Sequence, residues 1–202
     1  PGAGKSVALM RLALQQALLV LDGLPSPQVP VLVPLRNYRP LSQPEKFLAR
    51  HVAALAGDAA AVHRQLALSL HERLERGQLL LLLDGLDELP VKFLNWSLKR
   101  WQGFFAKYGS GGRGNRIIVT ARNADLAYLS GLPIVSLRPL SHESKSLLLG
   151  QYLSAEDSAN LWARLHEPSY RNILELTGNP FWLVCIAQLH AARKSLPATR
   201  SQ

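Results

Sequence analysis

Cysteine is almost absent from this sequence, and so are long apolar runs. Cys185 is the only cysteine among 202 residues, which excludes an intramolecular disulfide and a multi-cysteine zinc site. No run approaches the roughly 20 apolar residues that a membrane-spanning helix needs. The N-terminus also lacks the basic start and apolar stretch of a signal peptide. These absences predict no membrane partner, and they fit a reducing, cytoplasmic setting.

Acidic residues are also few, with 14 Asp plus Glu against 23 Lys plus Arg, for a net charge of +9. Such a charge raises the question of a nucleic-acid partner, because binding to phosphates needs clustered cations. The basic residues are spread along the chain, and no continuous basic arm with interleaved aromatics occurs. The charge therefore predicts a basic surface on an anion-binding protein, with no clear nucleic-acid signal.

With 48% hydrophobic residues the chain has material for one large or two small domains. The first part alternates apolar strands with helical patterns, which predicts an α/β fold with a mainly parallel sheet. The predicted strands are 31–35, 79–83, 116–120 and 134–137, and the predicted helices are 7–21, 44–55, 59–76 and 91–108. Only helices follow, over 141–153, 155–166, 170–176 and 181–194, with Ser141 and Ser154 as N-caps. This change near residue 140 predicts a small helical domain.

The chain opens with a phosphate-loop pattern. The letters PGAGKS from Pro1 to Ser6 match the last six positions of G-x-x-x-x-G-K-[ST]. In this pattern the glycines let backbone N–H groups curve around phosphates, the lysine reaches the β- and γ-phosphates, and the hydroxyl coordinates Mg²⁺. The first glycine would lie two residues before Pro1. We therefore expect the strand that feeds the loop, the first of the sheet, to be missing from the chain.

A second motif supplies carboxylates. Five leucines from Leu79 to Leu83 end at Asp84, as in a Walker B strand whose carboxylate holds Mg²⁺ beside Ser6. The alternative is a buried strand that ends in an ordinary Asp-Gly turn. Asp87 and Glu88 follow, and three carboxylates within five residues repel one another unless a cation or a catalytic role compensates. The pattern favours a nucleotide site.

A third candidate is Arg122, at the end of the run RIIVTAR that begins at Arg116. An arginine at the end of a neighbouring strand can read the γ-phosphate and stabilise charge during transfer. It can equally cap the strand and pair with a surface carboxylate. With the two preceding motifs present, we interpret it as a phosphate sensor.

The segments PGAGKS, LLLLLDGLDEL, RIIVTAR and LTGNPFWL, in this order, resemble the NACHT family within the STAND class of P-loop ATPases. The DGLDE run is the most specific element. The resemblance extends over essentially the whole chain. It implies a P-loop NTPase three-layer sandwich over residues 1–140 and a helical domain over 141–202, with the first strand expected between 116–120 and 134–137.

The resemblance also implies roles for individual residues. The phosphate and metal ligands would come from the loop and from the Walker B strand, Asp84 holding Mg²⁺ with Ser6. Asp87 or Glu88 would activate water, with Asp87 as first choice, and Arg122 would be the sensor. Pro180 would pack on adenine, which favours ATP or ADP over GTP. The phosphate-binding residues would be Gly2, Ala3, Gly4, Lys5, Ser6 and Val7.

The resulting hypothesis is a slowly hydrolysing ATPase that acts as a signalling switch, in immunity or antiphage defence. Nucleotide exchange would control self-association through the NTPase domain, and effector and sensor domains are expected in the full-length protein. The alternatives are a cycling AAA-like remodelling or DNA-processing ATPase, a nucleotide-binding scaffold that never hydrolyses, and a small-molecule kinase.

Overall fold

The computed structural model describes residues 2–23, 28–39, 42–55, 60–122 and 133–193. The chain divides into two compact units. The α/β unit spans Ser6–Pro133, and the helical unit combines Ile134–Gln202 with the short segment Pro1–Lys5. The predicted domain boundary between residues 140 and 141 stays a prediction.

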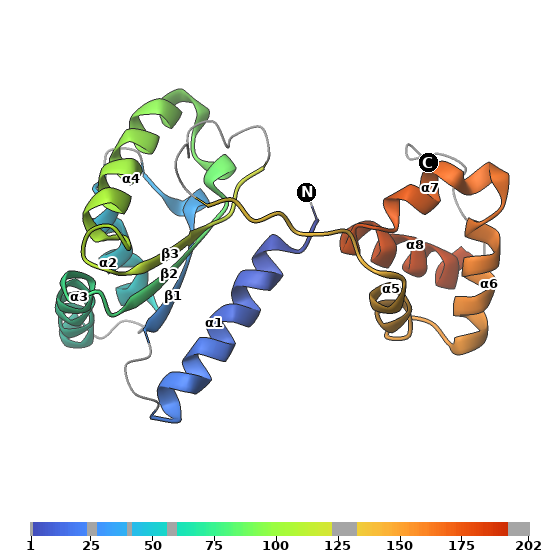
Figure 1. Ribbon diagram of the computed structural model, residues 1–202, viewed down its shortest axis with the longest axis horizontal. Helices are drawn as coiled ribbons and strands as arrows, with labels where there is room; N and C mark the ends of the chain where they lie inside the picture. Colours follow the sequence, from blue (N-terminus) through green and yellow to red (C-terminus); the bar gives the residue numbers. More distant parts are fainter. Residues whose placement is uncertain (1, 24–27, 40–41, 56–59, 123–132, 194–202) are drawn as a thin grey trace. The chain divides into compact units, whose positions relative to one another are not determined.

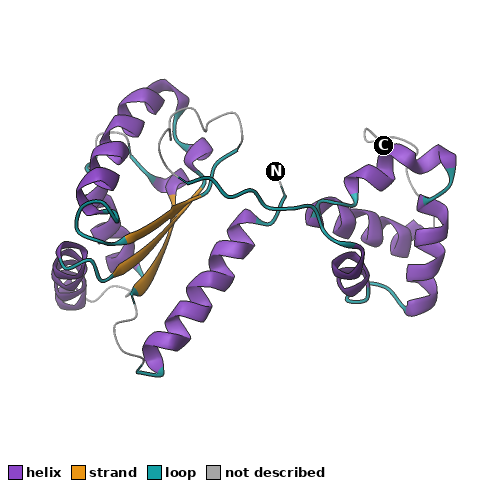
Figure 2. Cartoon of the chain, viewed as in Figure 1, coloured by secondary structure: helices purple, strands orange, loops and turns teal. Residues whose placement is uncertain are grey.

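The α/β unit is built on a parallel sheet of three strands in the order β1-β2-β3 (Figure 1 and Figure 2). The strands are β1 (Val29–Pro34), β2 (Leu79–Asp84) and β3 (Arg116–Val119). In the register, Val31 lies beside Leu81, and Leu82 lies beside Ile118. Three of the predicted strands and the parallel arrangement are therefore confirmed.

Helices connect the strands, and their positions confirm the helices predicted for this part. They are α1 (Lys5–Leu21), α2 (Pro44–Ala54), α3 (Ala60–Glu75) and α4 (Leu94–Tyr108), with 3₁₀ turns η1 (Leu35–Asn37), η2 (Leu86–Glu88) and η3 (Val91–Phe93). Gly23, two residues after the end of α1, has a positive φ of 70°, a conformation typical of glycines that follow a helix.

Strand β2 is buried along both of its faces. Its alternate side chains Leu79, Leu81 and Leu83 join the core formed with α2, α3 and α4. Leu80 and Leu82 pack with Leu9 of α1 in a separate core. Because successive residues of a strand point to opposite faces, an unbroken leucine run suits a strand that helices cover on both sides. The predicted three-layer sandwich follows from this packing.

The prediction of a strand at Ile134–Leu137 is wrong. These residues have no strand assignment, and the side chain of Val135 is 90% exposed. A strand forms only where a neighbouring strand supplies hydrogen-bond partners, and no described strand pairs with this segment. An apolar, β-branched sequence was therefore not sufficient to form a strand here.

The helical unit has its own core. Its elements are α5 (His142–Leu149), α6 (Ala155–Leu165), η5 (Pro168–Tyr170), α7 (Arg171–Leu176) and α8 (Pro180–Arg193). Leu149, Leu161, Leu165 and Leu183 are fully buried in this core. Both predicted N-caps are confirmed, because the Ser141 and Ser154 hydroxyls accept hydrogen bonds from the backbone N–H of Ser144 and Asp157.

Candidate functional site

The carboxyl end of β2 carries Asp84, and a threonine from the next strand region holds its side chain. The Thr120 hydroxyl donates a hydrogen bond of 2.6 Å to Asp84 Oδ1. The same hydroxyl accepts the backbone N–H of Gly85 at 2.8 Å. Thr120 is 9% exposed, and its hydroxyl links Asp84 to Gly85 through one donated and one accepted hydrogen bond, at the corner where the chain leaves β2. Thr120, which lies outside β2, thus orients Asp84, the first candidate metal ligand.

Backbone bonds close the same corner. Thr120 accepts the backbone N–H of Leu86 and donates its own N–H to Leu83, at 2.8 and 2.9 Å. Gly85 has a φ of +81°, in the left-handed region that side chains disfavour. A Cβ there would also lie 2.8 Å from Glu88 Cδ. The glycine after Asp84 is therefore what lets the chain turn directly into η2.

The next two candidates form an ion pair with each other. Arg122 Nε lies 2.7 Å from Asp87 Oδ2. The Asp87 side chain is 10% exposed and that of Arg122 is 58% exposed. Arg122 thus pairs with a carboxylate, as the alternative interpretation of the sequence predicted. That carboxylate belongs to Asp87, the residue expected to be the base. Glu88 is exposed and takes part in no ion pair among the described residues.

The three carboxylates of the DGLDE run do not converge. Asp84 turns to Thr120, Asp87 turns to Arg122, and Glu88 folds over Gly85. In the described ranges no three His, Cys, Asp or Glu side chains are grouped so that they alone would hold a metal ion. The repulsion expected from their spacing is relieved by separation and by one arginine. A metal here needs ligands beyond these carboxylates.

Ser6 lies at the start of α1, and the orientation of α1 within the α/β unit aims this end toward the carboxyl edge of the sheet. Gln16 Nε2 donates to the carbonyl of Gln28 at 3.1 Å, just before β1 begins. The later part of α1 therefore lies at the amino edge of the sheet. From Gln16 back to Ser6 the helix covers roughly 15 Å, and β1 is roughly 20 Å long. The start of α1 therefore extends along most of the strand, toward the carboxyl edge of the sheet.

The glycines of the phosphate-loop pattern adopt conformations that few other residues tolerate. Gly2 and Gly4 have φ values of 77° and 84°. A Cβ on Gly2 would lie 2.4 Å from Phe181 Cβ, so the site also lacks space for a side chain. A Cβ on Gly4 would be 3.9 Å from Pro180 Cγ, an ordinary contact, so its φ is the constraint. The helix after the loop, predicted over residues 7–21, begins at Lys5.

The residues around Pro180 lie against this loop within the helical unit. The backbone N–H of Phe181 donates to the carbonyl of Gly2 at 3.4 Å and to Asn179 Oδ1 at 3.0 Å. Asn179 directly precedes α8 and Pro180 is its first residue, positions at which an asparagine cap and a proline are favoured. The structure thus brings together Gly2, Gly4 and Pro180, three of the predicted nucleotide ligands.

The sequence prediction missed some of the residues that shape these sites. Thr120 lies in the run RIIVTAR, but no local pattern indicates its partner Asp84, which stands at the end of the adjacent strand. The contact of Phe181 with Gly2 had no local signal. Ala3 lies in the loop, and the side chain of Val7 on α1 is 67% exposed.

A parallel sheet with helices on both faces, a carboxylate at the end of its central strand and a glycine turn opening a helix defines a P-loop NTPase. The sequence profile of the NACHT domain matches residues 1–156. The chain belongs to the NACHT family, whose domains are nucleotide-binding NTPases. The match ends before Pro180, so the adenine contact expected of Pro180 stays a prediction. A comparison with curated proteins found no match. No helix in the described ranges is long and apolar enough to span a membrane.

Proposed function

We propose that this NACHT domain is an ATP-binding, slowly hydrolysing switch in which nucleotide exchange controls self-association. The observation that carries the proposal is the corner after β2. There Thr120 orients Asp84, and Asp87 holds Arg122. A sensor arginine with a carboxylate partner has two alternative ligands, that carboxylate and a γ-phosphate, and this is what a two-state switch requires.

The described residues fit a nucleotide with Mg²⁺. The positive φ values of Gly2 and Gly4 let successive backbone N–H groups face one anion, and Lys5 opens the helix behind them. Thr120 occupies one oxygen of Asp84, and the described residues place no hydrogen bond on the other. Ser6 and Asp84 would hold Mg²⁺, which would neutralise phosphate charge. Ala3 and Val7 would contribute backbone to the loop and helix.

Hydrolysis needs a group that orients or deprotonates water, and Asp87 and Glu88 are its candidates. Asp87 is nearly buried and engaged by Arg122, whereas Glu88 is exposed. If Arg122 turns to the γ-phosphate, Asp87 is released at the same moment and becomes available to water. This coupling would make hydrolysis depend on the sensor, and it favours Asp87.

The helical unit would report the nucleotide state. Pro180 and Phe181 lie on the glycine loop, so adenine stacking on Pro180 would link the base to α8. ADP would hold one arrangement and ATP another, and the difference would expose surfaces for self-association. Effector and sensor domains of the full-length protein would then supply the output and the input.

Replacing Lys5 tests the phosphate site. In Lys5→Ala the charged hydrogen bonds to phosphate disappear, and we expect ATP affinity to fall about tenfold or more. The measurement is a titration of the full-length protein with a fluorescent ATP analogue. Arg11→Ala is the matched control, because it removes one exposed positive charge from the same helix. An unchanged affinity in Lys5→Ala would contradict the assignment.

Replacing the two carboxylates tests catalysis. We expect Asp87→Asn to slow single-turnover hydrolysis by about a hundredfold, the lower range for a positioned base, while ATP still binds. Glu88→Gln removes a carboxylate one position away and should have a smaller effect. Wild-type rates in both variants would remove the proposed base, and rapid turnover stimulated by DNA would favour a cycling ATPase instead.

A further inference from the structure

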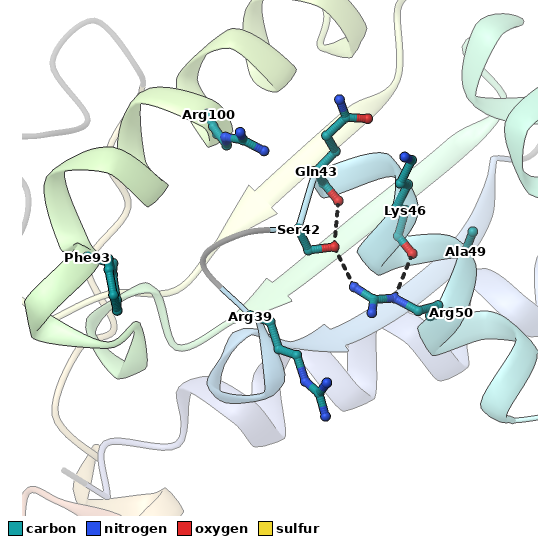
Figure 3. Close-up of a pocket in the computed structure, with 8 residues that line it drawn as sticks. All are labelled: Arg39, Ser42, Gln43, Lys46, Ala49, Arg50, Phe93 and Arg100. Atoms are coloured by element: carbon teal, nitrogen blue, oxygen red, sulfur yellow. Dashed lines mark hydrogen bonds between the residues drawn. The ribbon is translucent and has the colours of Figure 1, made fainter.

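A second candidate site lies in the α/β unit, in an open groove of about 1040 Å³ between α2 and α4. Phe93 and Arg100 line one side of the groove, and Lys46 and Arg50 of α2 line the other (Figure 3). Arg39 lines it from the segment after η1. These residues come from α2, η3, α4 and the segment after η1, so the sequence alone shows no cluster.

The groove is strongly and one-sidedly charged. Four of its lining residues are cationic and none is acidic. None of the four pairs with a carboxylate of the described ranges. Unpaired cations at a shared surface repel each other, and an anionic ligand removes that cost. The groove therefore has the electrostatics of a polyanion site.

Buried aromatic residues stand next in the chain to several of the lining residues. The fully buried Trp101 packs against Tyr38 and Phe47 at ring-centroid distances of 5.4 and 6.3 Å. The Tyr38 hydroxyl donates to the carbonyl of Ser42 at 2.6 Å, which fixes one wall. Burial raises the pKa of the Tyr38 phenol, against the opposing effect of Arg100, so the donor stays protonated. Arg50 is tied down by hydrogen bonds to the Ser42 hydroxyl and the Lys46 carbonyl.

Two flat surfaces stand at the α4 side. The Phe93 ring is 42% exposed and borders the groove. The guanidinium carbon of Arg100 lies 3.8 Å from the centroid of the Trp96 ring, and Trp96 is itself 36% exposed. Aromatic rings and guanidinium planes are the surfaces on which unpaired bases stack. Neither surface would be needed to bind a compact anion.

We propose that this groove binds the backbone of single-stranded nucleic acid, with bases stacking on Phe93 and on the Arg100 guanidinium. The cations are spread along an open groove instead of converging on one point, which suits a chain of phosphates. Acidic peptides share the charge but lack planar bases. The site is separate from the nucleotide site and does not depend on the proposed ATPase activity.

The test is binding of a short, fluorescently labelled single-stranded oligodeoxynucleotide to the full-length protein, measured by anisotropy at several salt concentrations. The triple variant Arg39→Gln, Lys46→Gln, Arg100→Gln should bind at least about tenfold more weakly. Its salt slope should fall by about 2, since each phosphate contact on a single strand contributes about 0.7. The matched control is Arg11→Gln, Arg73→Gln, Arg116→Gln, which removes the same charge from exposed positions outside the groove. Lys5→Ala should bind as the wild type does.

Stacking is tested separately at Phe93. Phe93→Ala should weaken binding about fivefold or more, and Phe93→Tyr should restore it, because only the ring is required. Absence of binding, or equal loss in the triple variant and its control, would overturn the proposal. So would equal competition by inorganic polyphosphate together with no effect of Phe93→Ala, which would show a general anion site. Circular dichroism of each variant checks that it is folded.

Discussion

Two polar side chains pin the two ends of β2, and they act by hydrogen bonding across segments far apart in the sequence. At the carboxyl end Thr120 bonds to Asp84 and Gly85. At the amino end the buried Asn115 amide donates to the carbonyls of Leu74 and Tyr108 and accepts the N–H of Leu79. Each buried polar atom involved has a partner, and losing that partner is costly.

Thr120 can be tested with an isosteric change. Thr120→Val keeps the shape but leaves the buried N–H of Gly85 without an acceptor, which should lower the free energy of unfolding by about 1–3 kcal/mol. Urea denaturation measures this, and Thr120→Ser, which retains the hydroxyl, should recover most of the loss. Equal stability of the valine variant and the wild type would show that the hydroxyl bridge contributes nothing.

At the scale of elements, α4 contains a glycine that lowers the stability of the helix. Gly103 lies inside this helix, is exposed, and would place a Cβ in open space. Glycine in a helix interior is less favourable than alanine because the unfolded chain has more backbone freedom to lose. The residue therefore lowers stability without a compensating contact.

We expect Gly103→Ala to raise the free energy of unfolding by roughly 0.5–1 kcal/mol. Gly114→Ala is an instructive contrast, since its Cβ also meets open space but its φ is 88°. That conformation disfavours alanine, and the change should destabilise by about 1 kcal/mol. Thermal melts of both variants measure whether each change raises or lowers the stability. A change in the same direction in both variants would contradict the backbone explanation.

On the scale of the whole molecule, each unit has a core that shares no residue with the other. The core of the helical unit gathers side chains from α5, α6, α7 and α8 around Leu161. Leu161 is fully buried, whereas Leu147 on α5 is 69% exposed. Burial of this kind, and not helix propensity alone, holds short helices together.

Leu161→Ala should destabilise the helical unit by about 2–5 kcal/mol, through lost burial and a new cavity. Hydrogen exchange read by mass spectrometry should then speed up in α5, α6 and α8. Leu147→Ala removes the same atoms from the surface and should leave exchange nearly unchanged. If the two variants exchanged alike, the packing described around Leu161 would be incorrect.

Local patterns determined most of the elements. The leucine run of β2, the Ala- and Leu-rich α1 and the serine caps of α5 and α6 were all predicted, because period and capping depend on neighbouring residues. Ile134–Leu137 shows where this reasoning fails. Its composition is that of a strand, but strand formation depends on a partner elsewhere in the chain.

The sequence by itself was enough to predict the candidate site, since Gly2, Gly4, Lys5, Ser6 and Asp84 follow patterns that few other functions require. Only the tertiary structure decided which side chains meet. Thr120 reaches Asp84 across 36 positions of sequence, Arg122 reaches Asp87, and Arg39, Lys46 and Arg100 share one groove. The physical reason is that parallel pairing of β2 with β3, and packing of α2 beside α4, bring together residues that no local pattern relates.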